Sequence, residues 1–268
     1  MLDYHLHSSF SGDCKEAMEE TILEAIKLGG HELCFTDHLD YDYPSHDIAF
    51  DFNADGFSQE FERLKEKYKG QLTLKKGIEL GLQYHIVDQC RDFVRAFQPD
   101  FVLCSFHVAE KKDLFNGDFF KDKTSHQAWR AYYEDVLRTL KVFKDYSIVS
   151  HLDLPKRYEP ALRQVDLKDM EAFIIPVLDQ IIQDGKGIEV NMSGLRTDLE
   201  ETLPNPEILA LYYERGGRII TIGSDAHRKE DIYSHFKEIL VLLKTIGFDH
   251  IASFDKMQVQ MIPIETLL

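Results

Sequence analysis

Residues 218–227 read Arg-Ile-Ile-Thr-Ile-Gly-Ser-Asp-Ala-His and give the clearest indication of the fold class. An apolar, β-branched run ends at Gly223, and a carboxylate and an imidazole follow at Asp225 and His227. A continuous apolar run is typical of a strand that is buried on both faces, as in a parallel sheet. The stretch therefore predicts a buried strand whose C-terminal end carries chemically active side chains.

The same arrangement recurs along the chain. Six further apolar runs predict strands at 2–5, 32–36, 72–80, 101–106, 147–151 and 187–192. Amphipathic stretches predict helices at 15–28, 58–68, 86–97, 125–143, 167–183, 206–214 and 232–245. Seven alternations of strand and helix are the signature of an α/β protein with a parallel sheet. We expect residues 1–268 to form one domain closed as a (β/α) barrel, although periodicity alone also fits an open, doubly wound sheet.

The composition limits the partners. The chain of 268 residues has 31 Lys and Arg against 47 Asp and Glu, a formal net charge of -16. This acidic excess argues against binding nucleic acid or a membrane surface, because phosphate contacts need clustered Lys and Arg. There is no apolar run of about 20 residues, the first ten residues lack the basic start and apolar stretch typical of a signal peptide, and the four cysteines form no CxxC pair. We therefore expect a cytoplasmic protein with reduced thiols, and the sequence leaves its oligomeric state open.

Histidines gather where the predicted strands end. Six of the twelve stand at or just after a strand's C-terminal end, and the carboxylates Asp13, Glu79 and Asp225 join them. In parallel α/β folds these ends converge on one face, which holds the active site. Imidazole nitrogens with a few carboxylate oxygens are ligands of Zn, Mn or Fe. The following residues therefore predict a polynuclear metal site: His5, His7, Asp13, His38, Glu79, His107, His151, Asp225 and His227.

Most of these residues would have a structural explanation if each stood alone. A single His-x-His pair, such as His5 and His7, is a weak signal, and His107 or His151 could be a satisfied core histidine. Glu79 is harder to explain, because carboxylates are rarely buried in an apolar strand without a cation partner. Its flanking glycines, Gly77 and Gly81, indicate that another group approaches the backbone closely.

The ordered motifs resemble a known family. They are His5-Leu-His7-Ser8, Thr36-Asp37-His38, Gly77-Ile-Glu79, Ser105-Phe-His107, His151-Leu-Asp153 and Gly223-Ser-Asp225-Ala-His227. As a set they resemble the polymerase and histidinol phosphatase (PHP) superfamily, over residues 3–228. The tracts at 151–158 and 191–196 resemble, more narrowly, its stand-alone histidinol-phosphate phosphatases.

This resemblance implies a distorted, seven-stranded, TIM-like (β/α) barrel with three divalent ions, Zn, Mn or Fe, at the C-terminal end of the strands. It assigns one ion to His5, His7, Glu79 and Asp225, a second to Glu79, His107 and His151, and a third to Asp13, His38 and His227. Glu79 bridges the first two ions. At the position of Asp13 many members have His, which leaves the metal preference of the third site open.

The activity that the resemblance implies is hydrolysis of L-histidinol phosphate to L-histidinol and phosphate in histidine biosynthesis. Attack by a metal-bridging hydroxide is expected, with Asp225, Glu79 and His227 as catalytic residues. The chemistry of a polynuclear metal site agrees with this activity. Phosphoryl transfer needs neutralisation of the charge on the phosphoryl oxygens and a positioned nucleophile, and clustered metal ions supply both. We expect Arg196, with Arg157 or Arg228 as further candidates, to hold the phosphate, since guanidinium groups bind it bidentately. Asp37, Asp153 and Asn191 are candidates for orienting the ligand imidazoles, and Asp37 and Asp153 could equally be caps.

Other functions stay open at this point. The same metals could serve a different ester, such as a nucleotide, a nucleic-acid 3′ end or phosphotyrosine. A metal-dependent amidohydrolase also uses His-x-His on a first strand, and a metal-bound protein without turnover is a non-enzymatic alternative. The chain has no GxSxG, GxxxxGK[ST] or GxGxxG motif. The segments 37–57 and 111–123 are longer than ordinary connections, and we expect them to be irregular loops. They are candidates for recognising the imidazole end of the substrate.

Overall fold

The computed structural model describes residues 1–45 and 50–268. Its main sheet consists of parallel strands in the order β1-β2-β4-β5-β8-β9-β10. Their bounds are β1 Leu2–Leu6, β2 Glu32–Phe35, β4 Thr73–Gly81, β5 Phe101–Ser105, β8 Ile148–Val149, β9 Gly187–Asn191 and β10 Ile220–Gly223. The strands are buried almost throughout, as their continuous apolar runs predict.

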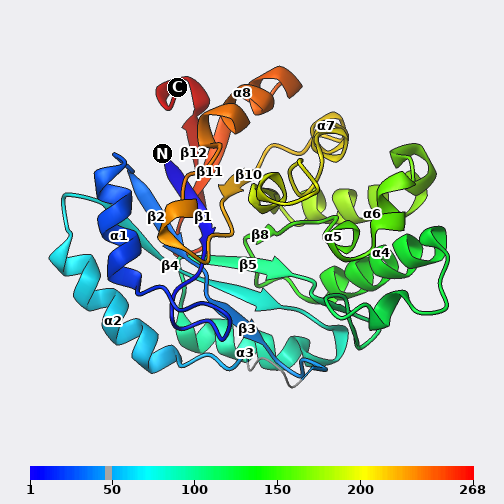
Figure 1. Ribbon diagram of the computed structural model, residues 1–268, viewed down its shortest axis with the longest axis horizontal. Coiled ribbons are helices and arrows are strands. Elements are labelled where there is room, and N and C mark those ends of the chain that lie inside the picture. The colour runs from blue at the N-terminus through cyan, green and yellow to red at the C-terminus, as the bar shows by residue number, and fades with distance from the viewer. Residues whose placement is uncertain (46–49) are drawn as a thin grey trace.

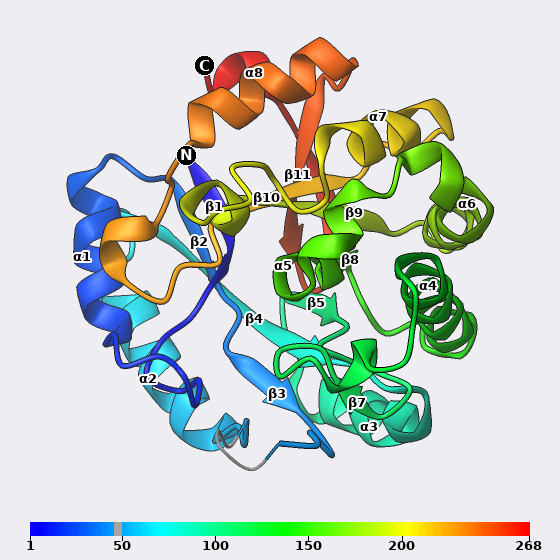
Figure 2. The ribbon, with the colours of Figure 1, turned by 45° about the vertical axis from the view of Figure 1, so that its right-hand side comes forward.

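Helices surround this sheet on the outside (Figures 1 and 2). Their bounds are α1 Met18–Lys27, α2 Ala54–Lys67, α3 Val87–Phe97, α4 Ser125–Val142, α5 Pro155–Tyr158, α6 Leu167–Gln183, α7 Pro206–Glu214 and α8 Phe236–Ile246. Local signals fix several of their ends. Thr124 and Gln127 form a capping box at α4, and the Asn205 side chain accepts from the Ile208 amide ahead of α7.

The sheet closes into a distorted barrel. At the seam between β10 and β1, the chain makes a parallel bridge from Leu6 to Ala226, and the His7 amide donates to the Ala226 carbonyl at 2.9 Å. The Asp3 carboxylate supports this seam by accepting from the Ser224 amide at 2.8 Å. The structure therefore confirms the predicted seven-stranded (β/α) barrel and excludes the open sheet.

Strand β3 (His38–Asp40) is the distortion that matters for the site. Strand β2 pairs with the first half of β4, and β3 pairs with the second half, with His38 opposite Glu79. The segment 37–57, expected to be irregular, therefore begins with a short strand. Residues 46–49 of that segment lie outside the described residues.

Two further differences come from local backbone geometry. The segment 111–123 is not wholly irregular, because β6 (Val108–Ala109) and β7 (Lys112–Asp113) form a small antiparallel hairpin. Helix α8 begins four residues later than the predicted start at 232. Tyr233 and His235 have positive φ angles of 56° and 58°, which no right-handed helix accommodates.

The C-terminal hairpin covers the barrel at the end where β5 begins. It consists of β11 (His250–Asp255) and β12 (Gln258–Pro263). The ring of Phe254 lies 5.1 Å from that of Phe101 and 6.2 Å from that of Tyr4, measured between centroids. The opposite mouth, where the strands end, remains available for a functional site. No helix in the described ranges is long and apolar enough to span a membrane.

Candidate metal centre

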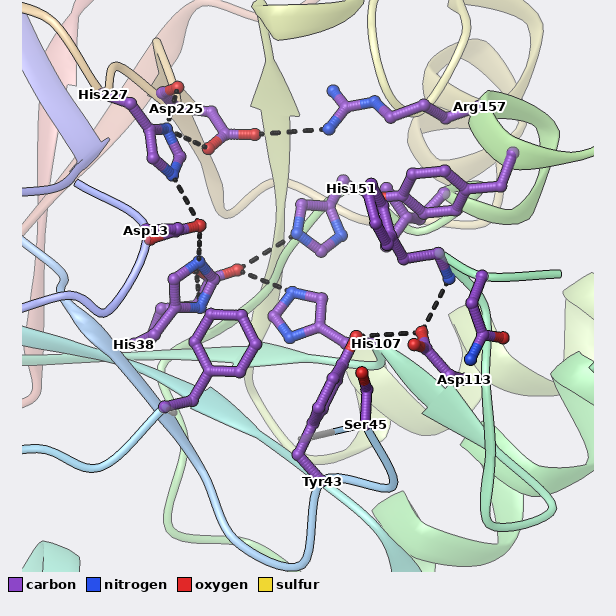
Figure 3. A pocket seen from close by; sticks show the side chains of 16 residues that line it. Asp13, His38, Tyr43, Ser45, His107, Asp113, His151, Arg157, Asp225 and His227 are labelled. Carbon is purple, nitrogen blue, oxygen red and sulfur yellow. Dashed lines mark hydrogen bonds and ion pairs between the residues drawn. The ribbon is translucent and has the colours of Figure 1, made fainter. Parts of the chain in front are cut away.

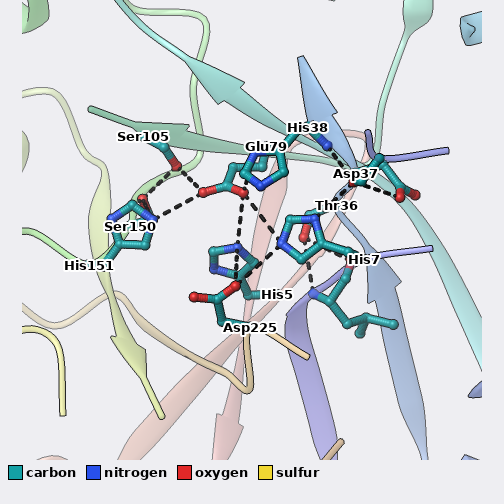
Figure 4. A network of polar contacts seen from close by, with 12 residues as sticks. His5, His7, Thr36, Asp37, His38, Glu79, Ser105, Ser150, His151 and Asp225 are labelled. Atoms are coloured by element: carbon teal, nitrogen blue, oxygen red, sulfur yellow. Dashed lines mark hydrogen bonds and ion pairs between the residues drawn. The ribbon is translucent and has the colours of Figure 1, made fainter. Parts of the chain in front are cut away.

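All nine predicted ligands converge at the C-terminal ends of the strands (Figures 3 and 4). They come from β1, β3, β4 and the segments that directly follow β1, β5, β8 and β10. The parallel sheet causes this convergence, because it points every strand's C-terminal end to the same mouth. Residues separated by more than two hundred positions in the sequence thus share one cluster.

Glu79 lies at the centre of the cluster and is 1 % exposed. Its Oε2 atom is 3.2 Å from His5 Nε2, 3.5 Å from His7 Nε2 and 3.0 Å from His38 Nδ1. Its Oε1 atom is 3.2 Å from His107 Nε2 and 3.1 Å from His151 Nε2. One buried carboxylate therefore faces five imidazoles, with each oxygen directed to a different group.

Asp225 and Asp13 complete the cluster on the outer side. Asp225 Oδ1 lies 3.4 Å from His7 Nε2, and Asp13 Oδ2 lies 3.2 Å from His227 Nε2 and 3.6 Å from His38 Nε2. The Asp13 and His227 side chains are 25 % and 34 % exposed, whereas the inner ligands are almost fully covered. Their position at the opening suits a separate, outer ion.

The donor atoms fit metal ions. Four buried atoms have no hydrogen-bond partner in the described part of the chain: His5 Nε2, His7 Nε2, His38 Nδ1 and Glu79 Oε2. Leaving such atoms unpaired is costly, and it points to a ligand that they are meant to bind. Four groups have ligand atoms within 4.8 Å of one another. They are His7, His38 and His227; His5, His7 and Asp225; His5, Glu79 and His151; and His38, Glu79 and His107.

The surroundings of Glu79 and His7 favour the deprotonated forms that bind metal ions. Burial raises the pKa of Glu79, but the neighbouring His5 and His38 outweigh it and hold that pKa well below its usual range. His7 behaves differently, because burial and the nearby His227 and His38 lower its pKa to about 3. Glu79 is therefore an anion at neutral pH, and His7 is a neutral imidazole with a lone pair for a metal ion. Metal binding requires both of these deprotonated forms.

Two supporting carboxylates are absent from the sequence predictions. Glu189 Oε1 lies 2.7 Å from His5 Nδ1, and Asp40 Oδ2 lies 2.6 Å from His107 Nδ1. Such contacts fix the tautomer and orientation of a metal-binding imidazole. Glu189 carries the same signal as Glu79, a carboxylate inside a buried apolar strand, and this signal could have identified it.

The predicted orienting residues act in different ways. Asp37 accepts from Ser11 Oγ at 2.9 Å, and that hydroxyl lies 3.0 Å from His7 Nδ1, so Asp37 acts through a serine. Asn191 Nδ2 lies 3.3 Å from both His5 Nδ1 and Asp225 Oδ2.

The third predicted orienting residue, Asp153, makes other contacts. It accepts from Lys156 Nζ at 2.6 Å and from the Asn205 amide at 3.0 Å. These partners belong to α5 and to the cap of α7, so Asp153 ties two helices together rather than orienting a ligand imidazole.

The three predicted arginines have different surroundings. Arg157 lines the cavity, donates to Ser193 Oγ, and places Nη1 3.7 Å from Asp225 Oδ2. Arg196 lies outside the cavity lining, and its guanidinium donates to the Ser224 carbonyl at 2.7 Å. Arg228 is exposed and is also outside the lining. Arg157 is therefore the arginine that a substrate in the cavity would meet.

The cavity has a volume of about 240 Å³ and two unlike sides (Figure 3). One side consists of metal-ligand candidates. The other side comes from loops, the β6–β7 hairpin and α5, and its described residues are Tyr43, Ser45, Phe50, Asp113, Phe115, Asn116, Leu154, Arg157 and Tyr158. This volume suits a small molecule rather than a polymer.

Comparison with known proteins agrees with this geometry. The family model described as PHP domain matches residues 3–193. A histidinol-phosphatase from Lactococcus lactis is 29 % identical over 260 residues, which cover 96 % of each chain. A probable histidinol-phosphatase from Thermotoga maritima is 32 % identical over 254 residues, which cover 94 % of this chain and 95 % of the relative.

A solved structure is similar over nearly the whole chain. It is histidinol phosphate phosphatase from Lactococcus lactis in complex with zinc, L-histidinol and phosphate, and it superposes with a TM-score of 0.89 at 28 % identity. The match covers 97 % of this chain and 98 % of that one.

Proposed function

The chain belongs to the PHP domain family, and on that premise we propose that it hydrolyses L-histidinol phosphate to L-histidinol and phosphate, a step of histidine biosynthesis. The observation that carries this function is the cluster around Glu79, in which one buried carboxylate faces five imidazoles beside a cavity of small-molecule size. The curated relatives of matching length carry the same activity in their names.

Three divalent ions would be held by the nine clustered residues. We assign His5, His7, Glu79 and Asp225 to the first ion, Glu79, His107 and His151 to the second, and Asp13, His38 and His227 to the third. Zinc is the ion in the related Lactococcus lactis structure, and Mn and Fe suit the same donors. Bound ions supply charge neutralisation for the phosphoryl oxygens and lower the pKa of a coordinated water.

The chain's own residues would position the phosphate and its nucleophile. Asp225 lies between the metal-ligand candidates and Arg157. Its Oδ1 atom is 3.4 Å from His7 Nε2, and its Oδ2 atom is 3.7 Å from Arg157 Nη1. Ser193 Oγ donates to Asp225 Oδ2 at 3.0 Å and holds this orientation. Arg157 would bind phosphate oxygens from the cavity wall. Glu79 and His227 complete the predicted catalytic set.

The site of action is also a proposal. The four cysteines are buried and unpaired, which is typical of proteins in a reducing compartment. We therefore expect this enzyme in the cytoplasm, acting on a small phosphorylated molecule and not on nucleic acid.

The test is to purify the protein, quantify its metals, and measure phosphate release from histidinol phosphate, a nucleotide and phosphotyrosine. We expect bound divalent ions and release from histidinol phosphate at a far higher kcat/KM than from the other two. Faster phosphate release from the nucleotide or from phosphotyrosine would contradict the proposed substrate and identify that ester as the better one. A protein that binds no divalent ion would contradict the metal assignment itself.

A further inference from the structure

Asp113 is a buried carboxylate in the cavity wall that the metal centre does not use. It is 1 % exposed, and it ends strand β7 of the hairpin that directly follows the ligand candidate His107. The Leu114 amide donates to the His107 carbonyl at 3.2 Å, so the hairpin returns Asp113 to the neighbourhood of the metal centre. A buried charge at such a place needs an explanation.

The hydrogen bonds of Asp113 are one-sided. Oδ1 accepts from the Tyr43 hydroxyl at 2.8 Å and from the Phe115 amide at 2.7 Å. Oδ2 is buried and has no hydrogen-bond partner among residues 1–45 and 50–268. The two bonds to Oδ1 fix the carboxylate in place, and burial, followed by the contact with Asp113, raises the pKa of Tyr43, so this donor stays protonated. One oxygen is thus held rigidly and the other lacks a partner.

Asp113 is also set apart by charge. Among the described residues that line the cavity, Asp113 and Arg157 are the charged side chains that are not ligand candidates. In Figure 3 Arg157 lies in the upper right of the view and Asp113 below it on the right, and His151 and His107 lie nearer the centre at heights between them. This arrangement fits a molecule with an anionic end at Arg157 and a cationic group near Asp113.

We propose that Asp113 accepts the ammonium group of the substrate and thereby selects phosphate monoesters whose alcohol carries a primary amine. The inference rests on the proposed function, because it concerns the leaving-group side of the same cavity. A primary aliphatic ammonium is charged at neutral pH, and a carboxylate with an unpaired oxygen in a covered site is its strongest partner.

Neighbouring aromatic rings agree with this assignment. Phe115 follows Asp113 by two residues, is 68 % exposed, and meets Tyr158 edge-to-face at 5.6 Å between centroids. Both rings line the cavity. They offer an apolar surface for the ring of the alcohol beside the acceptor for its amine.

The test compares two substrates and three variants. The substrates are histidinol phosphate and its deaminated analogue, 3-(imidazol-4-yl)propyl phosphate. For the wild type we expect kcat/KM to be at least about 30-fold lower on the analogue, the size of effect when a buried charge pair loses one partner. Asp113→Asn should lose a similar factor on histidinol phosphate and change little on the analogue, with metal content and thermal midpoint retained.

Two variants control for structure. Asp118→Asn makes the same change in the same segment, at a residue that pairs with Lys121 outside the cavity lining, and should leave both substrates unaffected. Tyr43→Phe removes the bond to Oδ1 but keeps the charge, so its loss on histidinol phosphate should be smaller than that of Asp113→Asn. Equal losses of Asp113→Asn on both substrates would overturn the proposal in favour of a structural role.

The substrate comparison in the wild type remains decisive if Asp113→Asn fails to fold, because equal rates on the ester with and without the amine would overturn the proposal. If the wild type releases no phosphate from histidinol phosphate, the proposed function fails separately. Phosphoethanolamine and ethyl phosphate then form a second pair of substrates that differ in the primary amine and lack the imidazole, and their rates of phosphate release are compared in the same way. A preference for the amine that Asp113→Asn removes would support the acceptor role, and no preference would overturn it.

Discussion

The cavity has two sides that are built in different ways. The metal wall, defined as the nine ligand candidates, of which all but His5 and His7 line the cavity, is carried by barrel strands and the segments that follow them. The leaving-group wall, defined as Tyr43, Asp113, Phe115, Leu154 and Tyr158, is carried by a loop, a hairpin and the short helix α5. Metal ligands must be held within fractions of an ångström, which strands achieve, whereas loops can vary to fit a substrate. If the proposed roles hold, the fold places the catalytic residues on strands and the residues that select the substrate on loops.

The strongest test of this separation is Glu79→Gln. Because Glu79 faces five imidazoles, losing its charge should release bound metal and abolish phosphate release from every ester, a loss beyond the roughly 100-fold seen for outer partners of a metal site. Metal analysis and phosphate assays on several esters measure both effects. Glu62→Gln, on the exposed surface of α2, is the matched control. Full metal content and activity in Glu79→Gln would disprove the site assignment.

Variants of Arg157 and Arg196 test which arginine binds the phosphate and which one supports the metal wall. Arg157→Ala should raise KM with metals retained, because it removes the cation that we propose binds the phosphate. The expected loss of substrate-binding free energy is about 2–4 kcal/mol. Arg196→Ala should instead lower the metal content, because Arg196 holds the carbonyl of Ser224, next to the ligand Asp225. Steady-state kinetics and metal analysis separate these outcomes. A raised KM with full metal in Arg196→Ala would make Arg196 a phosphate ligand, as the sequence predicts.

Glu189→Gln tests the support behind the metal wall. The Glu189 carboxylate lies 2.7 Å from His5 Nδ1 and also accepts from the His151 amide at 3.0 Å. Losing such a partner weakens metal binding by roughly 10–100-fold. Competition with a chelator measures the metal affinity. Asp113→Asn, in the leaving-group wall, is the control variant, and we expect its metal affinity to be unchanged. Unchanged affinity in Glu189→Gln would restrict its role to folding.

The two walls also differ in how far the sequence predicts them. The metal wall could be predicted, because strand periodicity places His5, Glu79 and Asp225 near strand ends and a parallel sheet brings those ends together. The leaving-group wall could not, because it depends on contacts between distant segments, such as the bond from Tyr43 to Asp113 across 70 positions. No local pattern encodes that pairing.

The start of α8 shows a similar limit on a smaller scale. The apolar periodicity extends back to residue 232, but left-handed backbone at Tyr233 and His235 delays the helix to Phe236. The Tyr233 amide donates to Asp3 Oδ2 at 3.1 Å, a residue 230 positions away in the barrel seam. Long-range contacts of this kind override local helical preference.

The smallest expected effect is a pH dependence confined to the metal wall. In the metal-free protein, burial lowers the pKa of His227, but the contact with Asp13 outweighs it and raises that pKa to about 9. Glu189 and Glu79 likewise outweigh burial at His5 and raise its pKa well above the usual value. A raised histidine pKa gives stability that is fully present below the unfolded value of about 6.5 and is lost as pH rises through the folded value.

The metal-free protein should therefore lose thermal stability between about pH 6.5 and 9, by a few degrees. His7 does not add to this loss, because its folded pKa of about 3 leaves it neutral in the folded protein throughout this window. Unfolded His7, with a pKa of about 6.5, still binds part of a proton near the lower end, which opposes the trend there. The metal-loaded protein should show the opposite trend, since ions bind deprotonated ligands and hold them more tightly as pH rises. Thermal midpoints of both forms across this range measure the difference. Asp113→Asn should leave both slopes unchanged, and a metal-free midpoint that rises toward pH 9 would mean that the imidazoles and carboxylates of the metal wall do not form charged pairs in the absence of metal.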